Sequence, residues 1–578
     1  MRVTIVVFVC LMLLSAVHVY RFVKLGSNYT TLIISTETGS NTGLEETYAY
    51  APFVNRIKFG QPTNDPYLWE YRSQKSPFIS ELLPAVVLGW IARATGVPFS
   101  LAVVKIFGPI LLVLLLRQIG ILGGINRLVS TTAAAAAVFT PMLFSLVPYP
   151  AVLTYISGAT ELEFQRLFHP LLPMIIVSLY IICAHKALTR KYYWPIILLA
   201  GVMLGALFYT YFFAWTLVWV GMGIITIANL NKSQRHNLRR LMGIMFIGLI
   251  IGIPYFINAW QFSNSITGQD FLEKSLLPIT EVHAWKMIRY LLLLILAVMI
   301  DRDWIKQITK KLLIALMLSA IILPDLSQIL FKVNLESDHW IVRFLYPLST
   351  FVAVLSIGPW LNRRFPAVAA VSMWVLIAIA GIRLTAVFSH QIKQPVDLFQ
   401  LGSERQQLFA FMKQNLKPGS IIGSLSFTEE VYLAAYTPFY PFIPRWERTI
   451  ALKAEPMNRL IFLAQQLAVA ESYFDDVMPV PLTPINYQDL PRFDQKALAV
   501  VFGIEYLFDR PPYYRHQDLL RQVKDKFRQP IPQPGKLDYV LITPTDRKFA
   551  NWEPKDNCQP LFNNSTYQLY RFNDCQEL

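Results

Sequence analysis

The sequence predicts a polytopic α-helical membrane protein that ends in an extracytoplasmic domain of α/β or α+β type. Of its 578 residues, 54% are hydrophobic and only 15% are charged, and the mean hydropathy is +0.41. A soluble protein of this length would need more charge to cover its surface. Long apolar runs dominate residues 1–388, whereas prolines, charges and short alternating segments take over in residues 389–578. These stretches are the predicted transmembrane and C-terminal domains.

The first apolar run, residues 3–23, is predicted to be a membrane span that stays in the protein. About 20 helical residues cross the ~30 Å hydrocarbon core of a bilayer. A cleaved signal peptide is the alternative, but the run is long for one and its SAVHVYR flank lacks a convincing A-x-A site.

Further predicted spans follow the polar first loop, residues 24–98. Inside that loop, residues 81–96 form a short run with Pro84 and Arg93, which favours an interfacial or re-entrant helix. The later apolar runs cover residues 99–118, 128–149, 167–185, 194–211, 212–230, 241–260, 285–300, 312–331, 341–361 and 366–388. Together with the first span they make about eleven spans. Residues 194–230 could instead form one span and a re-entrant piece.

The orientation follows from basic residues in alternate short loops, which are typical of the cytoplasmic side. These residues are Arg117, Arg127, Lys186, Arg190, Lys191, Lys232, Arg235, Arg239, Arg240, Arg302, Lys306, Lys310, Lys311, Arg363 and Arg364. An odd number of spans then places the first loop and the C-terminal domain outside, in a multi-pass protein of the cell (inner) membrane. Arg21 and Lys24 contradict this rule locally.

The formal net charge of +15 does not indicate nucleic-acid binding. The basic residues lie in short loops between apolar runs and not in an aromatic-interleaved strip or a known binding motif. We therefore expect membrane lipids as partners, and no nucleic acid.

The C-terminal domain shows alternating patterns typical of a mixed sheet with helices. Strands are expected at 420–427, 497–509, 537–544 and 566–572, and helices at 403–416, 456–473 and 515–527. A length of about 190 residues is usual for one domain.

The four cysteines fall into two groups. Cys10 and Cys183 lie inside apolar runs, where they act as small hydrophobic residues, and Cys558 and Cys575 lie in the polar tail. We predict a disulfide between the last two, because the tail is assigned to an oxidising compartment. The sequence has no CxxC or HExxH spacing that would indicate a zinc site.

The stretch from Gly43 to Phe78 carries an acidic pair, Glu45 and Glu46, followed by PFVNRI, DPYLWEY and Pro77. In this position after the first span, the pattern resembles the GT-C glycosyltransferases, which are polytopic enzymes that use lipid-linked sugars. In place of the acidic pair DE or DD that is commoner in these enzymes, this sequence has EE. The resemblance extends to about residue 388. It implies that Glu45 or Glu46 is the general base or a metal ligand.

Two more carboxylates in this loop, Asp65 and Glu70, could bind a metal ion or an acceptor hydroxyl. A divalent cation such as Mg²⁺ or Mn²⁺ would suit oxygen ligands, although some GT-C families work without one. The alternative is structural, because Asp-Pro commonly starts a turn.

Cations are expected at the outer ends of two spans. Arg166 and His169 belong to ELEFQRLFHP, and His339 and Arg343 belong to SDHWIVRFLYP. A guanidinium suits a bidentate contact with a polyprenyl phosphate, whereas the alternative is an arginine that snorkels to lipid headgroups. An aromatic cluster that includes Tyr211 lies in LFYTYFFAWT and indicates an interfacial belt.

Together these features predict an inverting glycosyltransferase that uses a polyprenyl-phosphate-linked sugar and a glycan, lipid or protein acceptor. A transporter or lipid-binding membrane protein is the first alternative. Such a protein would be expected to carry ionisable residues in mid-span, but the predicted spans are nearly free of them there. A non-catalytic scaffold with an external binding domain is the second.

Overall fold

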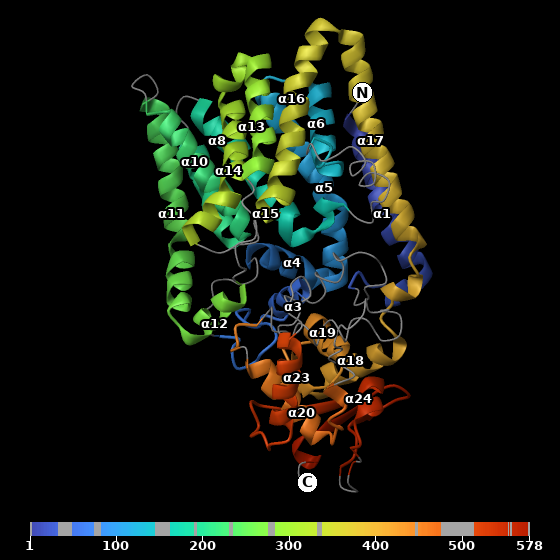
Figure 1. Cartoon of the computed structure of the whole chain (residues 1–578). Helices are drawn as coiled ribbons and strands as arrows, with labels where there is room; N and C mark the ends of the chain where they lie inside the picture. Colours follow the sequence, from blue (N-terminus) through green and yellow to red (C-terminus); the bar gives the residue numbers. More distant parts are fainter. Residues whose placement is uncertain are drawn as a thin grey trace.

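The computed structural model describes most of the chain. The described residues are 3–32, 49–73, 82–144, 162–189, 194–230, 235–275, 284–331, 338–444, 449–452, 454–474, 514–552, 554 and 558–575. They form a tall bundle of helices with a smaller C-terminal region against one end (Figure 1).

Each predicted span corresponds to a helix in the described part of the chain. The bundle helices are α1 (Val3–Leu25), α4 (Leu82–Thr95), α5 (Val97–Leu122), α6 (Arg127–Phe139), α8 (Leu172–Thr189), α9 (Trp194–Ala206), α10 (Phe212–Ala228), α11 (Arg235–Ser263), α13 (Ala284–Ile300), α14 (Ile308–Phe331), α16 (Tyr346–Arg364) and α17 (Pro366–Lys393). Among the described residues, 7 helices are long and apolar enough to cross a membrane, and five apolar helices, including α4, α6, α9 and α10, are shorter. The number of eleven crossings stays a prediction.

Residues 194–230 form a hairpin of α9 and α10 around the short helix η6 (Leu207–Tyr209). Helix α9 runs parallel to α11, because Gly201 meets Ile247 and Gly205 meets Ile251 one turn further on. An ideal Cβ on either glycine would lie 2.6 Å from the facing isoleucine, so only glycine permits this approach. The geometry favours two helices over one span with a re-entrant piece.

The described basic loops gather at the end of the bundle opposite the C-terminal region. Arg240 donates to the carbonyl oxygen of Ala187, and Lys310 forms an ion pair of 2.7 Å with Asp301. The turn from α16 to α17, which contains Arg363 and Arg364, lies at the same end (Figure 1). This arrangement matches the alternation that the positive-inside rule requires.

The local exception to that rule, Arg21, has a structural explanation. Its side chain is 5% exposed, donates to Gln394 Oε1 at 3.0 Å, and lies 3.2 Å from the ring centre of Phe399. Arg21 therefore ties α1 to the segment that leads from α17 into the C-terminal region.

Several ionisable residues within the predicted spans lie toward one end of the bundle and not in mid-span. Lys105 in α5, Arg289 in α13, Asp325 in α14 and Arg383 in α17 all lie within about three turns of the end that faces the C-terminal region. The described helices thus place these charges toward that end.

The C-terminal region contains a mixed sheet with the strand order β2-β1-β3-β5-β4, in which β2, β1 and β3 are parallel and β5 and β4 are antiparallel to their neighbours. The strands are β1 (Ile421–Gly423), β2 (Tyr440–Pro441), β3 (Tyr539–Ile542), β4 (Phe562–Asn563) and β5 (Gln568–Arg571). The helices include α18 (Ser403–Asn415), α19 (Phe427–Tyr436), α20 (Ala454–Gln466), α23 (Tyr514–Phe527) and α24 (Pro544–Phe549).

The predicted strands at 420–427, 537–544 and 566–572 are confirmed as the shorter strands β1, β3 and β5, and the three predicted helices are confirmed as α18, α20 and α23 with shifted ends. The strand expected at 497–509 lies outside the described residues. Helix α19 and strand β2 had no sequence prediction.

Two separate hydrophobic cores divide the described chain. The first extends from Cys10 to Val387 and includes Ala435, and the second extends from Leu408 to Phe572. We keep the division after residue 388 as a proposal.

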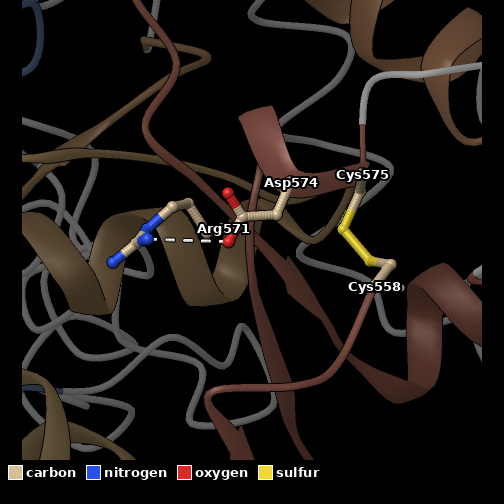
Figure 2. Close-up of a disulfide and its surroundings, with 4 residues drawn as sticks. All are labelled: Cys558, Arg571, Asp574 and Cys575. Atoms are coloured by element: carbon tan, nitrogen blue, oxygen red, sulfur yellow. Dashed lines mark ion pairs between the residues drawn. A yellow bond between two sulfur atoms is a disulfide. The ribbon is translucent and has the colours of Figure 1, made fainter. Parts of the chain in front are cut away.

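The predicted disulfide between Cys558 and Cys575 is confirmed, with Cα atoms 5.2 Å apart (Figure 2). The ion pair of Arg571 and Asp574, 3.6 Å long, lies beside it. The bridge joins the segment before β4 to the short helix after β5.

Candidate functional site

A buried arginine, Arg343, is the centre of a polar cluster at the end of the bundle that faces the C-terminal region. Its side chain is 6% exposed. Nη1 donates to Tyr211 Oη at 2.8 Å and also bonds His169 Nδ1, and Nη2 donates to His339 Nε2 at 3.0 Å. The fifth member is Tyr50, whose Oη bonds His169 Nε2. We refer to these five residues as the arginine cluster.

The hydrogen bonds assign the protons of the two histidines. A guanidinium can only donate, so His169 Nδ1 and His339 Nε2 must accept. His169 therefore carries its proton on Nε2 and donates to Tyr50, and His339 carries its proton on Nδ1 and donates to Tyr211 Oη at 2.6 Å. Both rings are neutral in this arrangement, and the positive charge of the cluster belongs to Arg343.

The cluster forms where regular helices are interrupted. Arg343 lies in the π-helix η9 (Ile341–Leu345), and His169 lies in η5 (Leu167–Leu171) with extended backbone angles. Tyr211 occupies the turn between η6 and α10, also with an extended backbone. These irregular ends bring polar groups together from three distant parts of the chain.

His339 and Arg343 were predicted to share one helical turn, and their side chains do bond each other. The structure also brings His169 to the same place. Arg343 is enclosed by protein, so an arginine that snorkels to the lipid surface does not describe it. Arg166 lies directly before η5 and is half-buried. Binding of substrate by any of these four residues stays a prediction.

The sequence did not indicate Tyr50, and it indicated Tyr211 only as part of an interfacial belt. The available signal for Tyr50 was its position between the acidic pair and PFVNRI, four residues after Glu46. Its ring stacks on Phe168 at 4.0 Å between centroids, with the two planes 9° apart. That stacking fixes the first loop against η5.

Glu45 and Glu46 lie outside the described residues. Their role as general base or metal ligand, and their proximity to Arg343, therefore stay predictions.

Asp65 is fully buried between the first loop and the C-terminal region. Oδ1 accepts from the backbone N–H groups of Tyr67 (2.9 Å) and Leu68 (2.8 Å), and Oδ2 accepts from Ile450 N (3.0 Å) and the Thr449 hydroxyl. Burial raises the pKa of Asp65, and these hydrogen bonds oppose the rise. Four donors on one carboxylate favour a structural role.

Glu70 also contacts the C-terminal region. It forms an ion pair of 3.2 Å with the fully buried Arg459, and Oε1 accepts from the backbone N–H of Lys536 at 3.0 Å. Both carboxylates that were expected to bind substrate or metal thus hold the first loop in place.

The described residues do not fit a divalent metal ion. They contain no group of three or more His, Cys, Asp or Glu side chains that could hold one. The oxygens of Asp65 and Glu70 face N–H, O–H and guanidinium donors, which a cation would have to displace.

Comparisons with known proteins add a distant structural similarity. No family model matches the sequence, and no curated protein matches it. The chain is similar to ArnT from Cupriavidus metallidurans in two crystal structures, one bound to undecaprenyl phosphate (10% identity) and one in the apo state (11% identity). Both matches cover 97% of each chain with a TM-score of 0.42. By its own helices and sheet, the chain is a polytopic α-helical membrane protein with a C-terminal α/β region.

Proposed function

We propose that this protein is an integral-membrane glycosyltransferase that moves a sugar from a polyprenyl-phosphate-linked donor to an acceptor on the side of the C-terminal region. The first support is the resemblance of the first loop to GT-C enzymes. The observation that carries the proposal is the arginine cluster, a fixed cation at the end of an apolar bundle.

A buried guanidinium suits the chemistry of a phosphate leaving group. Negative charge grows on the phosphate oxygen as the bond to the sugar breaks, and a preorganised cation stabilises that charge. His169, His339 and Tyr211 hold Arg343 in one orientation, so little reorganisation is needed when the charge develops.

The proposed reaction is a single displacement. Glu45 or Glu46 takes the proton from the acceptor hydroxyl, and the acceptor oxygen bonds to the anomeric carbon of the sugar. The bond from that carbon to the phosphate oxygen breaks on the opposite face, and the phosphate leaves with the electron pair. One displacement inverts the anomeric configuration, so a single base suffices.

A transporter is the less favoured alternative. Transport sites commonly lie near the bilayer midplane between broken helices. In the described helices, Lys105, Arg289, Asp325 and Arg383 lie toward the C-terminal region, as does the arginine cluster. This distribution favours chemistry at one membrane surface.

The direct test is to incubate the purified protein with a panel of radiolabelled polyprenyl-phosphate sugars and to follow hydrolysis or transfer. We expect at least one donor to release its sugar, with inverted configuration. A polyprenol glycoside without phosphate is the matched control and should not react. If no donor reacts and free polyprenyl phosphate does not bind, the proposed function is refuted.

The proposal also requires the C-terminal region to lie outside the cytoplasm, because donor and acceptor meet at that end. A reporter enzyme fused after Leu578 tests this orientation. Alkaline phosphatase, which is active only outside the cytoplasm, should be active in the fusion, and a β-galactosidase fusion should be inactive. The opposite pattern would contradict the topology.

A further inference from the structure

Helix α3 (Ala51–Lys58) of the first loop is held from two sides. On the bundle side it packs against Gly89 of α4, where an ideal Cβ would lie 2.5 Å from Ile57 Cγ2. On the other side, Nδ2 of the buried Asn55 donates to the carbonyl oxygens of Ala434 (2.9 Å) and Thr437 (2.7 Å). The helix therefore has little room to shift between α4 and α19.

Arg56 adds a second connection to the C-terminal region. It is fully buried, and Nη2 donates to the Phe439 carbonyl at 2.7 Å while Nε donates to the Pro66 carbonyl at 3.0 Å. Its Cζ atom lies 3.6 Å from the ring centre of Tyr440. Burial lowers the pKa of Arg56 to about 10, so the group stays charged at neutral pH.

The opposite end of α3 reaches the arginine cluster. Tyr50 directly precedes the helix, and its hydroxyl bonds His169, which in turn bonds Arg343. Eight helical residues span about 12 Å, which is short enough to behave as one rigid body. A continuous series of contacts thus runs from the carbonyl of Thr437 to the guanidinium of Arg343.

We propose that the C-terminal region sets the geometry of the arginine cluster through α3, and that Asn55 and Arg56 are positioning residues that act through Tyr50. The inference rests on the proposed function, because it assumes that the cluster binds the donor phosphate. A rigid helix passes a displacement at one end to the other, so loosening Asn55 shifts Tyr50 and, through His169, the guanidinium.

The test is a double-mutant cycle of Asn55→Ala and Tyr50→Phe, with the affinity for decaprenyl phosphate and the melting temperature measured for each variant. Each single change is expected to raise the Kd by about 2- to 30-fold, the usual range for residues that modulate a site indirectly. The double variant should be no weaker than the weaker single variant, because both changes interrupt one series of contacts. Arg56→Lys keeps the charge and loses the guanidinium fork, so it should resemble Asn55→Ala.

Asn415→Ala is the matched control. Asn415 is exposed on α18, and its side chain donates only a local bond of 2.8 Å to the Phe411 carbonyl among the bonds described. Its removal should leave the Kd unchanged. A lower melting temperature for Asn55→Ala with an unchanged Kd would show that the contact only stabilises the fold and would overturn the proposal.

Affinity losses that multiply in the double variant would also overturn it. A wild-type protein that does not bind decaprenyl phosphate would contradict the proposed function, and the melting temperatures would then decide the positioning role alone. In that case non-additive shifts for Asn55→Ala and Tyr50→Phe support coupling through α3, and additive shifts exclude it.

Discussion

Replacement of Arg343 is the most direct probe of how this protein would handle a phosphate. Arg343→Ala removes the buried cation together with its bonds to Tyr211, His169 and His339. Arg343→Lys keeps the charge but cannot hold several acceptors with a planar fork. The two variants therefore separate the contribution of charge from that of geometry.

The expected magnitudes follow from these contacts. Loss of one preorganised donor to a developing negative charge lowers kcat by about 10²- to 10³-fold. We expect Arg343→Ala to lower kcat by about 10²- to 10³-fold or more. We expect Arg343→Lys to lower kcat about tenfold, because the charge remains. Removal of the guanidinium also takes away the Arg343 donor from the buried His169, at a cost in stability of about 1–3 kcal/mol.

The assay must separate activity from folding. Sugar transfer, affinity for polyprenyl phosphate and melting temperature should be measured on the same preparation. Arg528→Ala is a suitable control, because Arg528 is 61% exposed in its ion pair with Glu471, and surface ion pairs contribute about 0–1 kcal/mol. Its activity and affinity should match those of the wild type.

Two results would refute the reasoning. One is Arg343→Ala protein that binds and turns over the donor like the wild type. The other is Arg343→Lys protein that is as impaired as Arg343→Ala while both remain folded, since charge would then contribute nothing.

Three further predictions concern other parts of the chain. Glu45→Gln or Glu46→Gln should reduce the rate of sugar transfer by about 10²- to 10⁴-fold without loss of membrane insertion, because the amide cannot accept the proton. Near-normal turnover in both single variants and in the double variant would exclude this pair as the base. Replacing both Cys558 and Cys575 by serine should cost about 3 kcal/mol by the chain-entropy relation for a separation of 17 residues, and an unchanged melting temperature under oxidising conditions would contradict it. Burial raises the pKa of Glu430 well above its ordinary value, and a nearby buried carboxylate adds to the rise. The folded protein therefore keeps a proton on Glu430 that the unfolded chain loses above pH ~4.5, so the stability of the fold should fall as the pH rises from there. In a series of melting temperatures from pH 5 to 8, Glu430→Gln should reduce this fall. Equal slopes of melting temperature against pH for the variant and the wild type would contradict the assignment.

Several features followed from the sequence because they depend on local patterns. The length of residues 3–23 and of the later apolar runs predicted helices, since a helix satisfies its backbone hydrogen bonds within the segment. Alternating residues predicted β1, β3 and β5 in the same way. The disulfide followed from the position of two cysteines in a polar tail.

Local pattern was insufficient where partners are distant in the sequence. The polar character of Asp65 suggested a ligand, but its four donors come from its own turn and from residues 449–450. The short helix α19 had no clear signal either, because its burial depends on α3 and on strand β2. Tertiary contacts decided both cases.

The sequence by itself determined an apolar multi-helix chain, its change of character near residue 389, and the types of residue available for chemistry. The tertiary structure alone decided that Tyr50, His169, Tyr211, His339 and Arg343 meet. The physical reason is that helix interruptions and the docking of α3 depend on long-range packing, whereas hydropathy and periodicity report only the neighbours of a residue along the chain.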